Sequence, residues 1–302
     1  MYFRFAVVAL IAVCSAVIRP AAAQQPAAQP LQIPPNIEFQ TDVVYGKGGG
    51  KDLTLNLARP KIITSPAPCI VIIHGGGWSG GKKEQHNDLA VTLAGKGYVA
   101  VTVGYRLAPD AVFPAQVNDV KCAVRFLRNS ADTFKLDPRR IGAVGFSAGA
   151  HLSMLLGVTS KDDGLEGDGG YADQSSRVQA VVSFFGPTDL TAPEIFPDVS
   201  PILKKFLGGT LTEKPDLYKK ASPVTYVRRD SAPMLLFQGT NDILVNWKQA
   251  IRMVEALTKN DVDGRLELLL GLGHGWGGKE LIRTAETTFA FFEEKLSKPK
   301  LP

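Results

Sequence analysis

The stretch Gly145-Phe146-Ser147-Ala148-Gly149 decides which fold this chain of 302 residues is expected to adopt. It joins an apolar run over 140–146 to a segment over 151–156 whose residues favour a helix. Gly-x-Ser-x-Gly at a strand-to-helix junction is typical of a nucleophile elbow, a sharp turn that needs glycines and lifts the serine hydroxyl above the sheet edge. We therefore predict that Ser147 is a nucleophile. A serine with a purely structural role in a turn is the alternative.

The segments around the elbow alternate between strand-like and helix-like patterns. A glycine-rich turn at 46–50 joins two strand-like runs, 39–45 and 53–58, which predicts an antiparallel hairpin. The later apolar runs lack alternation, as is typical of parallel strands covered on both faces. We therefore predict an α/β fold, a mostly parallel eight-stranded sheet with helices on both faces. The later strands are expected at 69–74, 98–104, 141–146, 178–184, 234–238 and 266–270, and the helices at 88–96, 116–129, 147–158, 247–259 and 279–296.

Two stretches, 161–176 and 187–231, fit neither pattern and are interpreted as excursions above the sheet. The second is long enough to act as a cover over the site. The predicted catalytic domain spans residues 37–302.

The N-terminal region has the pattern of a signal peptide over residues 1–23. The positively charged Arg4 precedes an apolar run over 5–18, which is too short to span a bilayer comfortably, and Ala21-Ala22-Ala23 form a small-residue cleavage site before Gln24. An uncleaved membrane anchor is the alternative. We expect an exported protein, periplasmic or secreted, without stable membrane association after cleavage. Residues 24–36, rich in Gln, Pro and Ala, are predicted to form a flexible leader.

The composition is that of an ordinary globular protein, with 45% hydrophobic and 21% charged residues. The formal net charge is +5, but no Lys/Arg block or interleaving of basic and aromatic residues is present, so no nucleic acid partner is expected. Cys69 and Cys122 lie at apolar positions, where two free buried thiols are favoured over a disulfide, although an exported protein could form one. The sequence leaves the oligomeric state open.

A serine nucleophile needs a base, and the base needs a carboxylate that orients it. In this architecture the chain order is serine, acid, histidine. His274, flanked by glycines directly after the last predicted strand, is the histidine well downstream of Ser147 and is the predicted base. Two acids are candidates. Asp242 follows the seventh strand and is favoured; Asp189 follows the sixth and is interpreted as a residue that braces a loop.

The loop after the third strand, His74-Gly75-Gly76-Gly77-Trp78, is of the type that supplies an oxyanion hole. The predicted backbone donors are Gly76, Gly77 and Ala148, the last because it follows the nucleophile. A phosphate cradle is the alternative, but the Lys-Ser/Thr pair of a P-loop does not follow. Trp78 is predicted to contact the substrate and to narrow the acyl side of the site.

Several motifs carry a resemblance to a known family: VIIHGGGW at 71–78, YRLAP at 105–109, FPAQVNDV at 113–120 and LDPRRI at 136–141. They resemble the esterase branch of the α/β-hydrolases, and within it the bacterial feruloyl and acetyl-xylan esterase-like proteins. The chain is less similar to the related hormone-sensitive-lipase group, which usually has Asp before the serine and Gly-Gly after the alanine, where this chain has Phe146 and Gly149-Ala150. The resemblance implies hydrolysis of carboxylic esters through an acyl-serine, with no metal and no cofactor.

The leading hypothesis is therefore an exported serine carboxylesterase. The 24–36 leader is too short and too rich in proline to form a helical cap, so the alcohol side should be open while Trp78 restricts the acyl side. This favours short acyl groups on a small-molecule or polysaccharide-linked ester, with acetyl first and feruloyl second. A serine amidase, peptidase or arylformamidase is one alternative, and a hydrolase-like protein that only binds a ligand is another.

Overall fold

An eight-stranded sheet carries the site in the computed structural model, which describes residues 30–195 and 197–297. The strand order is β1-β2-β4-β3-β5-β6-β7-β8. β2 is antiparallel to both of its neighbours, and all other neighbouring strands are parallel. The mostly parallel α/β sheet is thus confirmed, with its antiparallel hairpin at the start. The strands are β1 Ile37–Gly48, β2 Lys51–Pro60, β3 Ala67–Ile73, β4 Val99–Val103, β5 Leu136–Phe146, β6 Ala180–Phe184, β7 Met234–Gly239 and β8 Gly264–Leu269.

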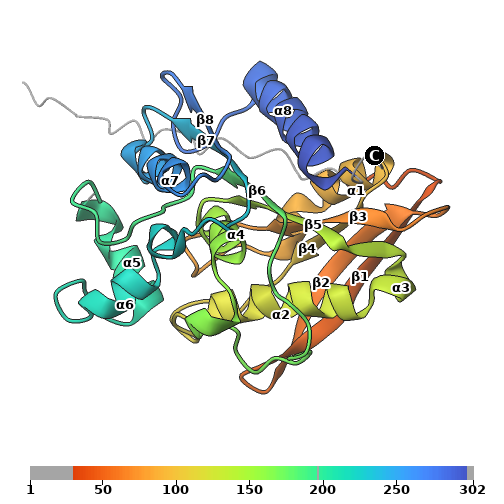
Figure 1. Ribbon diagram of the computed structural model, residues 1–302, viewed down its shortest axis with the longest axis horizontal. Helices are drawn as coiled ribbons and strands as arrows, with labels where there is room; N and C mark the ends of the chain where they lie inside the picture. Colours follow the sequence, from red (N-terminus) through yellow and green to blue (C-terminus); the bar gives the residue numbers. More distant parts are fainter. Residues whose placement is uncertain (1–29, 196, 298–302) are drawn as a thin grey trace, which may run out of the picture. The chain divides into compact units, whose positions relative to one another are not determined.

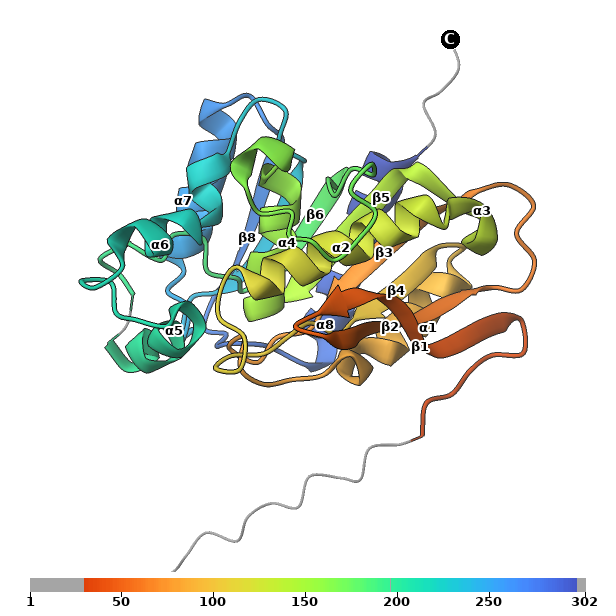
Figure 2. The ribbon, with the colours of Figure 1, turned by 90° about the horizontal axis from the view of Figure 1, so that it is seen from below.

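Helices cover both faces of this sheet (Figures 1 and 2). α1 and α8 lie on one face, and α2, α4 and α7 lie on the other. These elements all belong to one compact unit that starts at Gln32. The helices are α1 Asn87–Gly95, α2 Ala115–Asn129, α3 Ala131–Phe134, α4 Ala148–Val158, α5 Ser200–Leu207, α6 Pro215–Lys220, α7 Lys248–Lys259 and α8 Gly278–Leu296.

The central strands are apolar throughout because both of their faces are buried. In β3, the side chains from Ile70 to Ile73 are at most 1% exposed. Ile70 and Phe292 of α8 both pack around Gly142 of β5, where a Cβ would crowd them. Val71, the next residue of β3, belongs instead to the core cluster shared with α2 and α4. Successive residues therefore meet opposite helical layers, which explains why the sequence shows no alternation there.

β5 begins five residues earlier than the sequence predicts, at Leu136 instead of residue 141. Leu136 pairs with Ala67 of β3, so the strand continues through Pro138. The Asp137 carboxylate stabilises the first residues of this strand, because it accepts hydrogen bonds from the backbone N–H of Arg139 and from Nε of Arg140.

The two excursions differ in where they lie. The predicted cover, 187–231, contains the helices α5 and α6. The sequence did not predict them, because helices of eight and six residues are too short to show a helical period. The 161–176 stretch does not extend over the site. It lies along α2, where Lys121 and Arg125 both donate hydrogen bonds to the Glu166 carboxylate.

The predicted signal peptide lies outside the described residues, as do residues 24–29 of the predicted leader, and residues 30–34 of that leader are described without a helix or strand. Over residues 30–195 and 197–297, no helix has the length and apolar character needed to cross a membrane. Cys69 and Cys122 are both buried and free, as expected from the sequence.

Candidate active site

Ser147 lies at the junction between β5 and α4, at the predicted elbow. Its φ of 53° and ψ of −118° place it in a conformation that residues with a Cβ seldom adopt. The two flanking glycines are required by close backbone contacts: a Cβ on Gly145 would collide with the carbonyl of Gly149, and a Cβ on Gly149 would collide with that of Ile73. The GxSxG spacing therefore has a steric cause, and the serine is held half-buried at the carboxyl end of the strand.

His274 lies in the loop after β8, and its ring connects Ser147 with Asp242. Its Nε2 lies 2.9 Å from Ser147 Oγ and its Nδ1 lies 2.7 Å from Asp242 Oδ2. The carboxylate is acceptor-only, so Nδ1 carries the proton and Nε2 is free to accept the serine proton. The structure thus brings together the three residues that the sequence predicts.

Asp242 is fixed by four hydrogen bonds. Besides His274, the backbone N–H groups of Leu244 and Val245 and the Nε2 of Gln238 donate to its carboxylate. Burial raises the pKa of Asp242, but the hydrogen bonds from His274 and from these backbone amides outweigh burial, and the pKa lies below its usual value. Asp242 is therefore ionised wherever a neutral His274 can act as a base.

Asp189, the second candidate acid, has a different role in the structure. Its Oδ1 accepts hydrogen bonds from the backbone N–H and the hydroxyl of Thr191, and its Oδ2 lies 3.9 Å from Arg252. These contacts brace the loop after β6, which is the role predicted for Asp189 from the sequence.

The oxyanion loop turns back over the elbow through three consecutive residues with positive φ: Gly76 at 110°, Gly77 at 57° and Trp78 at 55°. No described residue accepts a hydrogen bond from the backbone N–H of Gly76 or Gly77. Ala148 is the first residue of α4, so its N–H has no partner four residues earlier in the helix. All three predicted donors thus have no backbone acceptor among the described residues, as an oxyanion hole requires.

The three other histidines do not contact the serine hydroxyl. His74 braces the oxyanion loop: its Nδ1 lies 2.7 Å from the carbonyl oxygen of Gly75 and its ring stacks on Tyr105 at 4.3 Å. Burial lowers the pKa of His74. His86 ends a 3-10 helix over Lys83–His86 and stacks on Phe146 at 4.2 Å, and burial lowers its pKa to about 4.

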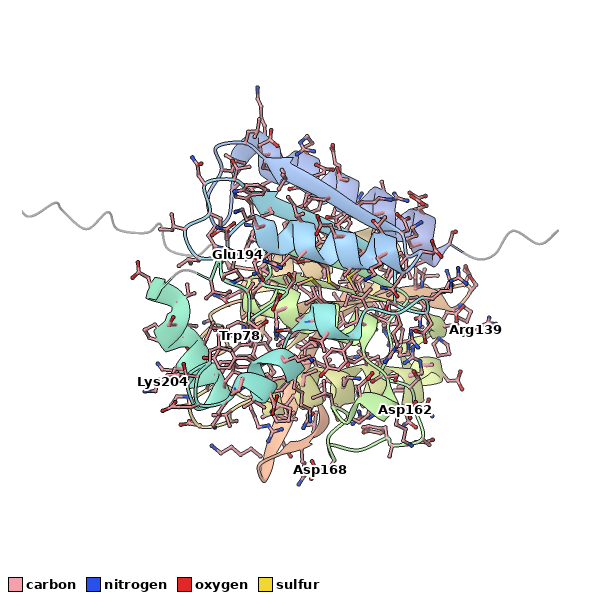
Figure 3. All side chains as sticks on the ribbon, turned by 60° about the vertical axis from the view of Figure 1, so that its left-hand side comes forward. Trp78, Arg139, Asp162, Asp168, Glu194 and Lys204 are labelled. Carbon is pink, nitrogen blue, oxygen red and sulfur yellow. The ribbon has the colours of Figure 1, made fainter. Side chains whose placement is uncertain are left out.

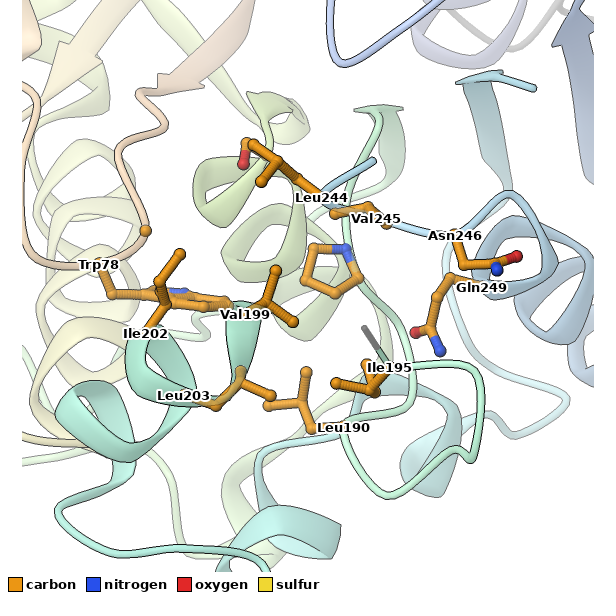
Figure 4. A pocket seen from close by; sticks show the side chains of 13 residues that line it. Trp78, Leu190, Ile195, Val199, Ile202, Leu203, Leu244, Val245, Asn246 and Gln249 are labelled. Atoms are coloured by element: carbon orange, nitrogen blue, oxygen red, sulfur yellow. The ribbon is translucent and has the colours of Figure 1, made fainter. Parts of the chain in front are cut away.

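An apolar pocket opens beside Ser147 with a volume of about 90 Å³ (Figure 4). Trp78, the predicted substrate contact, forms one side, and the cover contributes most of the opposite wall. Figure 3 shows Trp78 beside the cover helix α5, whereas Lys204 of the same helix lies at the outer surface. His274 is not among the pocket residues. They are Gly77, Trp78, Ser147, Pro187, Leu190, Ile195, Val199, Ile202, Leu203, Leu244, Val245, Asn246 and Gln249.

Sequence reasoning missed most of this wall and the aromatic contact behind His274. The ring of Phe185, whose φ is 47°, lies 4.6 Å from the imidazole and limits its tilt. In the sequence, only the position of Phe185 directly after an apolar strand and before Gly186 indicates that it lies near the site. The residues 190–203 gave no signal, because their apolar pattern is that of any core segment.

A metal site is not formed by the described part of the chain: no group of three or more His, Cys, Asp or Glu side chains is placed to hold an ion. Independence of metal remains a prediction, which EDTA treatment can test.

Comparison with known proteins shows which family the chain belongs to. The BD-FAE family model matches residues 55–257, more than half of the chain. Esterase LipC of Mycobacterium tuberculosis is 33% identical over 82% of this chain and 62% of its own length, and esterase LipQ of the same organism is 31% identical over 72% and 52%. The chain therefore spans between about half and three fifths of the length of these relatives.

Solved structures give the same result. A truncated carbohydrate esterase from gut microbiota superposes with a TM-score of 0.76 at 27% identity, over 86% of this chain and 97% of that one. The propionate-bound esterase Est2 of Thermogutta terrifontis superposes with a TM-score of 0.73 at 28% identity, over 88% and 97%. The chain belongs to the BD-FAE family, in the esterase branch of the α/β-hydrolases.

Proposed function

We propose that this protein is a serine carboxylesterase that works through an acyl-serine intermediate. The observation that carries the proposal is the continuous hydrogen-bonded chain from Ser147 Oγ through His274 to Asp242, next to backbone donors without a backbone acceptor among the described residues. Membership of the BD-FAE family and similarity to named esterases support the same reaction class.

The steps follow from the geometry. Ser147 Oγ attacks the ester carbonyl while its proton passes to His274 Nε2, and Asp242 stabilises the imidazolium. The carbonyl oxygen becomes negative and accepts hydrogen bonds from the N–H groups of Gly76, Gly77 and Ala148. His274 then gives its proton to the alcohol oxygen, the C–O bond breaks and the alcohol leaves. A water molecule, deprotonated by His274, hydrolyses the acyl-serine by the reverse sequence.

The pocket beside Trp78 is assigned to the acyl group. His274 must reach the leaving oxygen to protonate it, so the alcohol lies on the histidine side of the carbonyl. The pocket contains Ser147 and Gly77 but not His274, so it lies on the other side. Its far wall is closed by Leu190 and Leu203, which are 1% and 5% exposed. A closed apolar wall favours short acyl groups, acetyl to butyryl, and the similarity to a carbohydrate esterase favours acetyl groups on a polysaccharide, with feruloyl esters second.

Export is a separate part of the proposal and is supported by the sequence of residues 1–23 alone. N-terminal sequencing of protein recovered from a bacterial periplasm or medium should give Gln24 as the first residue. Recovery of protein that begins at Met1 from the cytoplasm would remove the export claim and leave the esterase claim intact.

The esterase claim is tested by turnover of matched p-nitrophenyl esters and p-nitroanilides of the same acyl groups, followed by acetate release from acetylated xylan. We expect ester hydrolysis that Ser147→Ala abolishes and much slower anilide hydrolysis. Faster cleavage of anilides would show an amidase. Absence of turnover by the wild type on both series would favour a protein that only binds a ligand.

A further inference from the structure

His151 is a completely buried histidine that the proposed reaction does not use. It lies on α4, one turn after the nucleophile, and its backbone N–H donates to the carbonyl of Ser147 at 3.1 Å. Its side chain is 0% exposed. A buried titratable group without a role in the chemistry needs a structural partner for each ring nitrogen, because an unpaired polar atom would destabilise the fold.

Both ring nitrogens have such partners, and the partners belong to different parts of the site. Nε1 of Trp78, at the end of the oxyanion loop, donates to Nδ1 at 3.2 Å. Nε2 lies 2.7 Å from the carbonyl oxygen of Ala221, in the cover directly after α6. An indole nitrogen can only donate and a carbonyl can only accept, so the two partners require a neutral ring with its proton on Nε2. One imidazole thus connects the oxyanion loop, the nucleophile helix and the cover.

The oxyanion loop needs this support because of its backbone. Trp78 has a Cβ and a φ of 55°, a left-handed conformation that is unfavourable for such residues and persists only where the surroundings hold it. The indole is held on one face by Phe206 of α5, which stacks on it at 4.2 Å, and at its edge by His151, whose ring is nearly perpendicular at 5.1 Å. The contact to Phe206 is apolar and does not fix rotation in the ring plane, whereas the hydrogen bond to His151 does.

We propose that His151 is a positioning residue that fixes Trp78, and through it the backbone N–H groups of Gly76 and Gly77, in register with the cover. This inference rests on the proposed function, since it assigns a purpose to the loop in that reaction. It adds that His151 connects the cover, which forms the acyl pocket, to the oxyanion donors by hydrogen bonds, besides the stacking of Phe206 on Trp78.

The test compares two substitutions of His151. In His151→Leu, the indole N–H and the Ala221 carbonyl lose their partner. In His151→Gln, the amide offers one acceptor and one donor. A donor that is misaligned rather than removed should lower kcat by about 10- to 100-fold, less than the full loss of an oxyanion donor. We expect this decrease for His151→Leu with KM changed less than about threefold, and recovery of most of kcat in His151→Gln.

Two measurements separate positioning from a general loss of stability. The Ki of butylboronic acid, which mimics the tetrahedral intermediate, should rise in His151→Leu by the same factor by which kcat falls. The rate at which paraoxon phosphorylates Ser147, followed by intact mass, should fall in parallel and does not depend on which ester is the substrate. Thr159→Val is the matched control, because Thr159 is also buried at the end of α4 but its hydroxyl donates to the carbonyl of Leu155 within the same helical turn.

Trp78→Phe keeps an aromatic ring and removes the indole N–H, so it provides a second route if His151→Leu does not fold. Its effect on kcat and that of His151→Leu should be strongly non-additive in the double variant. The proposal is overturned if His151→Leu lowers the melting temperature but leaves kcat, the boronate Ki and the phosphorylation rate unchanged. Failure of the proposed function looks different, because the wild type itself would then turn over no ester.

Discussion

His274 Nε2 lies 2.9 Å from Ser147 Oγ, although 127 positions separate the two residues in the chain. The contact exists because β5 and β8 point the same way and end at the same edge of the sheet. Ser147 is held by the turn into α4, and His274 is held from behind by Phe185 and from the side by Asp242. The catalytic geometry therefore depends on the sheet as much as on the two side chains.

Ser147→Ala should leave a folded protein without measurable esterase activity. Loss of the nucleophile of a cooperating triad lowers kcat by on the order of 10⁴- to 10⁶-fold. The serine side chain adds little to packing, so the melting temperature should stay within a few degrees of the wild type. Turnover of p-nitrophenyl acetate and thermal unfolding check both points, and His274→Ala should be almost as inactive. A Ser147→Ala protein with wild-type turnover would place the nucleophile elsewhere.

The two candidate acids are separated by a matched pair of substitutions. Asp242→Asn should lower kcat by about 10⁴-fold, because an amide would favour the wrong tautomer of His274. Asp189→Asn should reduce kcat much less, since its carboxylate contacts Thr191 and Arg252 and not the imidazole. Initial rates on one ester decide the matter, and the reverse order of effects would show that the acid is misassigned.

The role of the oxyanion loop can be tested by substitution of its glycines. Gly77→Ala should lower kcat by between about 10- and 1000-fold with little change in KM, because the loop amides meet charge only in the transition state. Its Cβ would lie 3.0 Å from Cγ2 of Ile202. Gly76→Ala is a poorer test, since its Cβ would collide with the backbone of Gly80 and disrupt the whole loop.

Gly50→Ala is the control for Gly77→Ala, because it also places a Cβ on a residue with positive φ. Gly50 has a φ of 78° in the turn between β1 and β2, and its Cβ would meet no atom within 4 Å. It should lower the melting temperature and leave kcat unchanged. If Gly77→Ala raised KM at constant kcat, the loop would bind substrate without stabilising the transition state.

How much of this could be predicted from the sequence depends on how local each signal is. Ser147 was predictable because the steric need for Gly145 and Gly149 is contained in five residues. His274 and Asp242 were predictable from chain order after the strands. The contact between Trp78 and His151 was not, because no short motif marks it and it depends on how the indole packs between α4 and Phe206 of the cover. The acyl pocket was missed for the same reason, apart from Trp78.

The stability of the protein should depend on pH through His151. Burial lowers its pKa from an ordinary value of 6.5 to about 4, so the folded protein keeps this imidazole neutral while the unfolded chain takes up a proton. The neutral imidazole contributes to the free energy of unfolding in full above pH 6.5. As the pH falls from 6.5 towards 4, this free energy decreases by roughly 3 kcal/mol for a pKa shift of this size. Urea unfolding of the wild type and of His151→Gln at several pH values measures it. The variant should show a shallower loss between pH 6.5 and 4, and equal slopes would contradict the assignment.

The acyl pocket predicts how chain length affects turnover. Each methylene that the pocket cannot hold should cost about 1–3 kcal/mol in kcat/KM, so acetyl and butyryl esters should exceed octanoyl esters by at least about tenfold. Ile202 lines this pocket and lies against Gly77, so Ile202→Ala should raise the octanoyl-to-acetyl ratio of kcat/KM by about tenfold or more. Lys204→Ala, two residues further along α5 but exposed at the surface, is the matched control and should leave the ratio unchanged. A wild-type maximum at octanoyl or longer, or an Ile202→Ala ratio equal to that of Lys204→Ala, would show that this pocket does not hold the acyl group.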